Sequence, residues 1–279
     1  MVLDYALETA VRQHVDVPTS RMIETAVGWL EVATLGPDSG RPLILVDHAM
    51  GDWASLFHIG QELAERQPSR RIIAWSRPGC GNSPAMAEAA GIDPLVQEAR
   101  VVLPALMSAL GIATADFLCH SDGATMAMMF AALFPDRVGR VVAIAPYGFA
   151  DSQFADNTHA LPAEEYASGL TMRLGAQHAD AKATYRRWRE RRLSNITSGW
   201  SALDVLAGMT APLLLIQGTM DEFNSPEQIS AVAEAVSGPV NWVLLRNQGH
   251  FLQHDVPEQI VCLASGHLEP GRRPMLLHS

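Results

Sequence analysis

The sequence has little of what would assign it to several common classes of protein. It contains a single lysine, Lys182, and its three cysteines form no CxxC pair, so neither a disulfide framework nor a zinc site is indicated. The 30 acidic residues outnumber the 20 basic ones and give a net charge of −10. This balance disfavours nucleic acid and anionic membrane surfaces as partners, because both repel an acidic protein.

Long apolar segments are also lacking. No hydrophobic run is long enough to span a bilayer. The first residues, Met1 to Tyr5, have neither the basic start nor the apolar core of a signal peptide. We therefore expect a cytoplasmic protein without nucleic-acid or membrane partners. A homodimer is compatible with these observations and rests only on the general frequency of such dimers.

What the chain does have is a regular alternation of apolar runs and amphipathic segments. At 279 residues it can bury a large core in one domain with an insertion. Residues 21–36 predict a β-hairpin with its tight turn at Gly28. Predicted buried strands follow at 42–46, 71–75, 115–119, 138–146, 212–218 and 241–245, and predicted helices at 54–66, 94–110, 125–134 and 226–236. This order predicts an α/β fold with a mostly parallel central sheet flanked by helices.

The segment from Cys119 to Gly123 lies between an apolar run and an Ala/Met-rich run that reads as a helix. Small residues on both sides of Ser121 permit a tight strand-to-helix turn, which would expose the serine hydroxyl beside the N–H groups of the helix N-terminus. If the motif is considered alone, an ordinary helix N-cap is the alternative role for this serine. The segment resembles the nucleophile elbow, G-x-S-x-G, of the α/β-hydrolase superfamily, with Cys119 in place of the first glycine.

Two later segments resemble the same superfamily. A Gly-x-x-Asp sequence that ends at Asp221 follows a predicted strand, as the acid loop does, and the Gly-His pair at His250 with Pro-Glu shortly after it is similar to the histidine loop. The order Ser121, Asp221, His250 is the chain order of these hydrolases. The resemblance implies that Ser121 is the nucleophile, His250 the general base, and Asp221 the group that orients the imidazole. Alternative candidates for the acid and the base are Glu222, Asp151 and His254.

The loop after the strand at 42–46 resembles the oxyanion loop of these hydrolases. Residues 48–50 stand where the family has His-Gly-x, with alanine in the glycine position. The resemblance implies that the backbone N–H groups of Met50 and Asp122 bind the oxyanion. Asp47, His48 and Asp52 contain possible metal-ligand atoms, but no further ligand cluster is recognisable. We expect no metal ion and no cofactor.

After residue 147 the alternation of strands and helices is interrupted. Residues 148–209 contain no strong strand and several helix-like patches, and they resemble the helical cap that α/β hydrolases insert over the active site after the sixth strand. The resulting division is a hydrolase core in two parts, 1–147 and 210–268, a cap over 148–209, and a loose C-terminal tail over 269–279.

The cap is where substrate binding is expected. Five arginines surround Trp188 between residues 186 and 192, and they form either a solvated basic face or supply one arginine that binds a substrate carboxylate. The carboxylate of Asp122 either lies in a buried polar network or faces the pocket, where it would favour a substrate with an amine or another hydrogen-bond donor. The candidate pocket residues are His48, Met50, Trp53, Phe149, Trp188, Trp200 and Phe251.

The resemblance implies a serine hydrolase that cleaves a small, mostly apolar ester or lactone through an acyl-enzyme. Within the fold, a carbon–carbon bond hydrolase of aromatic catabolism would use the same triad with an arginine on the substrate carboxylate. Two alternatives lie outside hydrolysis, a cofactor-free dioxygenase that cleaves N-heteroaromatic rings and a non-catalytic ligand receptor. Ser121 argues against epoxide hydrolases and haloalkane dehalogenases, which have aspartate at the elbow.

Overall fold

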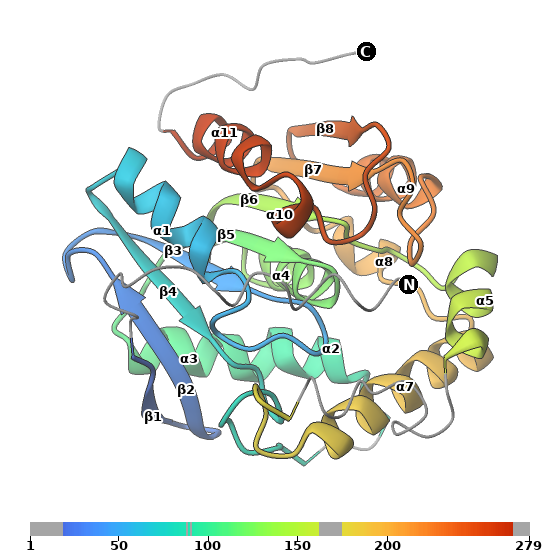
Figure 1. The fold of residues 1–279 in the computed structure, drawn as a ribbon, viewed down its shortest axis with the longest axis horizontal. Helices are drawn as coiled ribbons and strands as arrows, with labels where there is room; N and C mark the ends of the chain where they lie inside the picture. Colours follow the sequence, from blue (N-terminus) through green and yellow to red (C-terminus); the bar gives the residue numbers. More distant parts are fainter. Residues whose placement is uncertain (1–18, 88, 90, 162–174, 270–279) are drawn as a thin grey trace.

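An eight-stranded sheet forms the centre of the molecule (Figure 1). The computed structural model describes residues 19–87, 89, 91–161 and 175–269. The sheet has the order β1-β2-β4-β3-β5-β6-β7-β8. The strands are β1 (Arg21–Thr25), β2 (Gly28–Leu35), β3 (Arg41–Val46), β4 (Arg70–Trp75), β5 (Ala115–His120), β6 (Val138–Ile144), β7 (Leu213–Gly218) and β8 (Val240–Leu245). Strands β3 to β8 are parallel to their neighbours among themselves, whereas β1–β2 and β2–β4 are antiparallel. The predicted mostly parallel sheet is therefore confirmed.

Helices cover both faces of the sheet. They are α1 (Phe57–Arg66), α2 (Pro94–Gln97), α3 (Leu103–Ala109), α4 (Asp122–Leu133), α5 (Ser152–Ala160), α7 (Ala181–Ser198), α8 (Leu203–Leu206), α9 (Glu227–Ala235), α10 (Leu252–Asp255) and α11 (Pro257–Leu268). A π-helical turn, η2 (Glu98–Val102), joins α2 to α3, and a 3-10 turn, η3 (Pro135–Arg137), follows α4. Among the described helices, none is both long and apolar enough to cross a bilayer.

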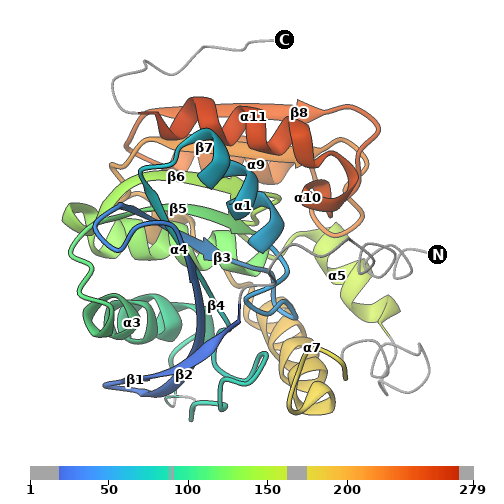
Figure 2. The same cartoon turned by 60° about the vertical axis from the view of Figure 1, so that its left-hand side comes forward.

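The alternation of side chains along each strand divides the core into two. In β3, Ile44 packs in one hydrophobic cluster, together with α2, α3, α4 and α9. Its neighbours Leu43 and Leu45 pack in the other cluster, with α1 and α11. Successive strand residues point to opposite faces, so an uninterrupted apolar strand supplies both clusters at once. Figure 2 shows α1 and α11 on one face of the sheet, with α3 and α4 on the other.

The hairpin turn and the start of one helix differ from the predicted positions. The hairpin turn was expected at Gly28, but Thr25 pairs with Gly28 in the sheet, so Ala26 and Val27 form the turn. Two hydrogen bonds of the Thr25 hydroxyl, one accepted from the Val27 N–H and one donated to the Gly28 carbonyl, stabilise this turn. Helix α1 begins at Phe57, three residues after the predicted start at Ala54.

The connection between β6 and β7 contains helices α5, α7 and α8. Its described residues form no strand of the sheet, and the isolated bridge from Phe149 to Ser201 closes its base. Helix α7 lies at the end of the molecule onto which the loops after β3, β4 and β5 open (Figure 1). The expected cap boundaries at 148 and 209 remain predictions. The expected loose C-terminal tail falls almost entirely outside the described residues, as do residues 1–18 of the core and 162–174 of the cap.

Candidate active site

The turn between β5 and α4 places Ser121 at a sharp reversal of the chain. Its φ of 53° lies in the left-handed region, which is strained for a residue with a side chain. The Ser121 N–H donates to the carbonyl of Ile144 in β6, and this bond of 2.9 Å helps to hold the reversal. A Cβ on Gly123 would overlap the carbonyls of Val46 and Asp47, so only glycine fits there. The Ser121 side chain makes no capping hydrogen bond to α4, which removes the N-cap alternative.

Three side chains from separate loops meet at this turn. Oγ of Ser121 lies 3.0 Å from Nε2 of His250, which follows β8. Nδ1 of His250 lies 3.0 and 2.9 Å from the two carboxylate oxygens of Asp221, which follows β7. Because carboxylates accept and do not donate, His250 carries its proton on Nδ1 and presents Nε2 as an acceptor to the serine hydroxyl. The three residues that the sequence selected are therefore in contact in the order that proton transfer requires.

The Asp221 loop explains why this acid faces the histidine. One carboxylate oxygen also accepts the backbone N–H groups of Phe223, at 2.8 Å, and Asn224, at 3.0 Å. These bonds fix the orientation of the side chain. Asp221 is 7% exposed, so its pairing with His250 is screened little by water.

The alternative acids and base lie elsewhere. Asp151 caps α5 by accepting the N–H of Phe154. Glu222 accepts the backbone N–H of His250 and does not contact its ring. His254 stacks on His58, with ring centroids 5.4 Å apart. None of these three contacts matches the arrangement of Asp221 and His250 around Ser121.

Asp122, the residue after the serine, is buried and fully engaged. Its side chain is 1% exposed, and it accepts a hydrogen bond of 2.9 Å from the hydroxyl of Tyr147. Its other oxygen pairs with Arg191 of α7. Burial raises the pKa of Asp122, but the charges of Arg191 and Arg77 outweigh it and lower the pKa to about 2. The carboxylate therefore belongs to a buried network and is not available to bind a substrate amine.

The predicted oxyanion loop is held by two histidines. The N–H of Met50 donates to Nδ1 of His48 at 3.2 Å, and the Met50 carbonyl accepts from Nε2 of His178 at 3.0 Å. Nδ1 of His178 in turn accepts the N–H of Gly81 in the loop after β4. The Met50 N–H can bind an oxyanion only by exchanging its bond to His48, so its role, and that of the Asp122 N–H, stay predictions.

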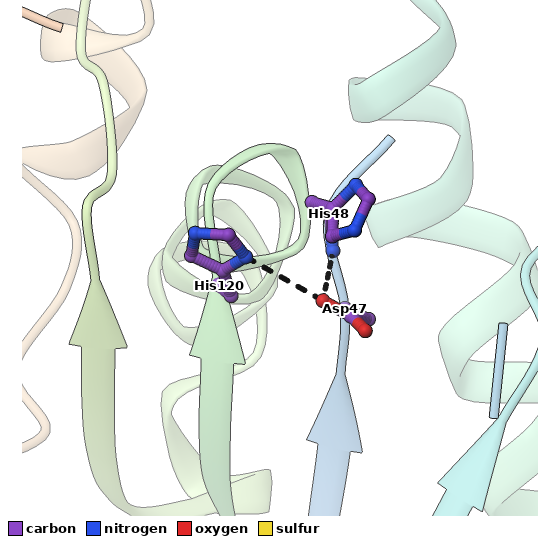
Figure 3. Close-up of side chains that lie close together, drawn as sticks. All are labelled: Asp47, His48 and His120. Carbon is purple, nitrogen blue, oxygen red and sulfur yellow. Dashed lines mark hydrogen bonds and ion pairs between the residues drawn. The ribbon is translucent and has the colours of Figure 1, made fainter. Parts of the chain in front are cut away.

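Asp47, His48 and His120 form a compact cluster behind this loop (Figure 3). Their candidate ligand atoms lie within 4.8 Å of one another, which is a spacing that a metal site could have. The ring nitrogen of His120 points at Asp47, whereas His48 turns its backbone N–H toward the carboxylate (Figure 3). Asp52, the third residue of the metal hypothesis, instead accepts from Ala54 and Ser55 in its own loop.

Three of the four ring nitrogens of this cluster have protein partners. Nδ1 of His48 accepts the Met50 N–H, which leaves the ring proton on Nε2 and no lone pair there for a metal. Nε2 of His120 donates to the carbonyl of His250 at 3.0 Å. Nδ1 of His120 lies 3.1 Å from Nε2 of Gln253. Burial lowers the pKa of His48 to about 3. The cluster therefore fits a hydrogen-bonded support for the loops of Met50 and His250 better than it fits a metal site.

A cavity of about 80 Å³ lies between α7, the loop after β4 and the start of the α2–η2 helix. Trp188 is the one candidate pocket aromatic that lines it among the described residues. Phe251 contacts the edge of the His250 ring at 5.2 Å, and His48 contacts Phe251 at 5.6 Å.

Three other candidates are half-buried and are not among the residues that line this cavity. Trp53 lies against Phe57 of α1 and belongs to the core on that face. Trp200 packs beside Tyr147, with ring centroids 5.4 Å apart. Phe149 is held through its backbone by the Gln228 side chain. The structure does not bring these three to the described cavity.

One of the five arginines of α7 is buried and three are half-buried, so they do not form the solvated basic face that was one of the two expected arrangements. Arg192 is 3% exposed and donates to Thr158 and to the carbonyl of Phe154 in α5. Arg191 donates to Asp122 in the elbow, and Arg187 donates to the carbonyl of Gly79 in the loop after β4. Arg186 is exposed. His178 and Tyr147 could not be identified from the sequence, because their partners are distant in the chain.

Comparison with known proteins places this fold and these loops in one family. A model described as "Alpha/beta hydrolase family" matches residues 43–261. Similar solved structures include an alpha/beta hydrolase fold protein from Chitinophaga pinensis (TM-score 0.68, 18% identity, covering 91% of this chain and 98% of that one). A carboxylesterase from Bacillus subtilis is similar with a TM-score of 0.64 and 18% identity, covering 90% and 92%. A proline iminopeptidase from Mycobacterium smegmatis has a TM-score of 0.61 and 19% identity, covering 88% and 96%. The chain belongs to the alpha/beta hydrolase family.

Proposed function

We propose that the protein is a serine hydrolase that cleaves a small carboxylic ester or lactone through an acyl-enzyme. The observation that carries the proposal is the contact chain from Ser121 through His250 to Asp221, with separations of 3.0 and 2.9 Å. A serine hydroxyl is a weak nucleophile at its own pKa, and an imidazole at this distance can accept its proton as the bond to carbon forms.

The mechanism follows from these positions. Oγ of Ser121 attacks the substrate carbonyl, and Nε2 of His250 takes the serine proton. Asp221 stabilises the imidazolium, and the N–H of Asp122 at the start of α4 donates to the oxyanion. His250 then protonates the leaving alkoxide. Water, deprotonated by His250, releases the acid from Ser121 by the same steps.

The family relationship supports hydrolysis but leaves the bond type open. Carboxylesterase and iminopeptidase both occur among proteins with a similar fold, so fold alone does not choose between esters and amides. We infer a short acyl group because the described cavity has a volume of only about 80 Å³, and the choice of an ester or lactone over an amide is part of the proposal.

Labelling with a fluorophosphonate tests the proposal, because this reagent reacts only with an activated serine. We expect one adduct per chain, located on Ser121 by peptide mapping. The adduct should be absent in Ser121→Ala and slowed about 10⁴-fold in Asp221→Asn, since an asparagine would favour the wrong tautomer of His250.

A folded wild-type protein without an adduct would refute the mechanism. Oxygen uptake with hydroxylated N-heteroaromatic rings would then identify a cofactor-free dioxygenase. Tight ligand binding without turnover would identify a receptor. Cleavage of a carbon–carbon bond with normal labelling of Ser121 would keep the triad and change only the substrate class.

A further inference from the structure

Arginines dominate the polar wall of the 80 Å³ cavity between α7 and the loop after β4. Arg77, Arg187 and Arg191 all line it, and Glu98 is the acidic residue among its described lining. Arg77 pairs with Glu98 at 3.3 Å. Arg191 pairs with Asp122, which lies beside Ser121. Two of the three positive charges are therefore balanced by carboxylates.

Arg187 has no carboxylate partner among the described residues. Its Nη2 donates to the carbonyl of Gly79 at 2.7 Å and to the hydroxyl of Thr184 at 3.3 Å. A Cβ on Gly79 would overlap this guanidinium, so the glycine leaves the space that Arg187 occupies. The described walls thus carry one excess positive charge, held in a fixed place.

Two further donors near the cavity are unsatisfied. Nε of Arg77 and Nε of Arg191 are buried and have no hydrogen-bond partner among the described residues. Buried donors normally have an acceptor, because leaving one unpaired is unfavourable. A planar carboxylate is the acceptor that matches guanidinium geometry best.

We propose that this cavity binds a carboxylate on the acyl part of the substrate, so that the enzyme prefers monoesters of short dicarboxylic acids. The inference rests on the proposed ester hydrolysis. One anionic group would neutralise the excess positive charge of the cavity. The volume of the cavity is about half of that which holds a benzene ring in other proteins. Ser121 is not among the described lining residues, so a few methylene groups must connect the carboxylate to the ester carbon.

Matched chromogenic esters test this preference. We would compare p-nitrophenyl butyrate, which is neutral, with the p-nitrophenyl monoesters of succinic and glutaric acid. Wild-type enzyme should hydrolyse at least one monoester with kcat/KM about 10- to 100-fold above that of the butyrate, the range expected for a hydrogen-bonded charge pair. Free glutarate or succinate should inhibit butyrate hydrolysis competitively.

Two variants of α7 locate the effect. Arg187→Gln should remove most of the preference, mainly through a higher KM for the monoesters, and Arg187→Lys should restore part of it. Arg186→Gln changes an exposed arginine of the same helix and should leave both activities unchanged. If Arg187→Gln fails to fold, two wild-type measurements still test the carboxylate site: the ratio of kcat/KM for the monoesters to that for the butyrate, and the inhibition by free dicarboxylates.

The outcomes separate this inference from the proposed function. Hydrolysis of the butyrate with no preference for the monoesters would overturn the carboxylate site and keep the serine hydrolase. A preference that Arg187→Gln leaves unchanged would also overturn it. No hydrolysis of any ester together with no labelling of Ser121 would refute the proposed function itself.

Discussion

Replacing Asp122 by Asn tests whether a buried charge connects the cap helix to the nucleophile elbow. The carboxylate of Asp122 is 1% exposed and faces two arginines, Arg191 in direct contact and Arg77 at 3.9 Å. Asparagine has nearly the same shape and can still accept from Tyr147, so the variant removes the charge and leaves the packing. Its effect therefore reports the ion pair.

Two estimates bound the expected loss in the free energy of unfolding. The shift in the pKa of Asp122 from 3.8 to about 2 corresponds to about 2 kcal/mol of stabilisation of the charged form. Leaving Arg191 buried without its partner typically costs about 3–5 kcal/mol. We expect Asp122→Asn to lower the free energy of unfolding by about 3 kcal/mol and the Tm by roughly 10 °C.

Urea unfolding and calorimetry would measure this loss, with a double-mutant cycle as the control. Adding Arg191→Gln to Asp122→Asn should cost less than the sum of the single variants, with a coupling of about 2 kcal/mol. The depressed pKa means that this stabilisation is complete above pH 4 and is lost as the pH falls from about 4 to about 2. A loss below 0.5 kcal/mol, or additive single effects, would show that the pair contributes nothing.

Two further predictions concern buried histidines. His120→Phe keeps an aromatic ring beside His250 but removes the hydrogen bonds to the His250 carbonyl and to Gln253; fluorophosphonate labelling of Ser121 should slow by about 100-fold because the base is displaced, the Tm should also fall because buried polar groups lose their partner, and an unchanged labelling rate would contradict a positioning role. Burial lowers the pKa of His267 to about 4, so its contribution to stability is complete above pH 6.5 and is lost as the pH falls toward 4. His267→Gln, which can still donate to the Pro212 carbonyl, should therefore lose less stability than wild type between pH 7 and 4, by up to about 3 kcal/mol; parallel urea-unfolding curves for the two proteins would refute this.

The sequence predicted those parts of the site that depend on local patterns. Ser121 is identified by the small residues around it, because the turn requires them at fixed positions relative to the serine. Asp221 and His250 follow strands whose apolar runs are unmistakable, and parallel strands bring their carboxyl ends to one edge. The fold is likewise predictable, since every apolar run that was predicted to be a strand contributes a strand to the sheet.

Contacts made between distant segments were not predictable. His178 joins the loops after β3 and β4, yet nothing in its neighbouring residues distinguishes it. The Met50 N–H was expected to be free for an oxyanion, and only the position of the His48 ring shows that it has a partner. Arginine composition favoured a solvated face for α7, whereas Arg192 stacks on Phe154 with its guanidinium 3.6 Å from the ring centre.

The contacts of α7 suggest why a helix so rich in arginine lies over the site. Arg187 binds the loop after β4, Arg191 binds the elbow after β5, and Arg192 binds the carbonyl of Phe154 in α5. Each contact is a directed hydrogen bond from a buried guanidinium, and such bonds fix rotation and register more tightly than apolar packing does. An apolar helix could slide by a turn with little loss, but α7 would leave buried charges unpaired if it did. The same arginines therefore hold the wall of the cavity, and in the proposed carboxylate site Arg187, which has no carboxylate partner in the described part of the chain, would supply the positive charge.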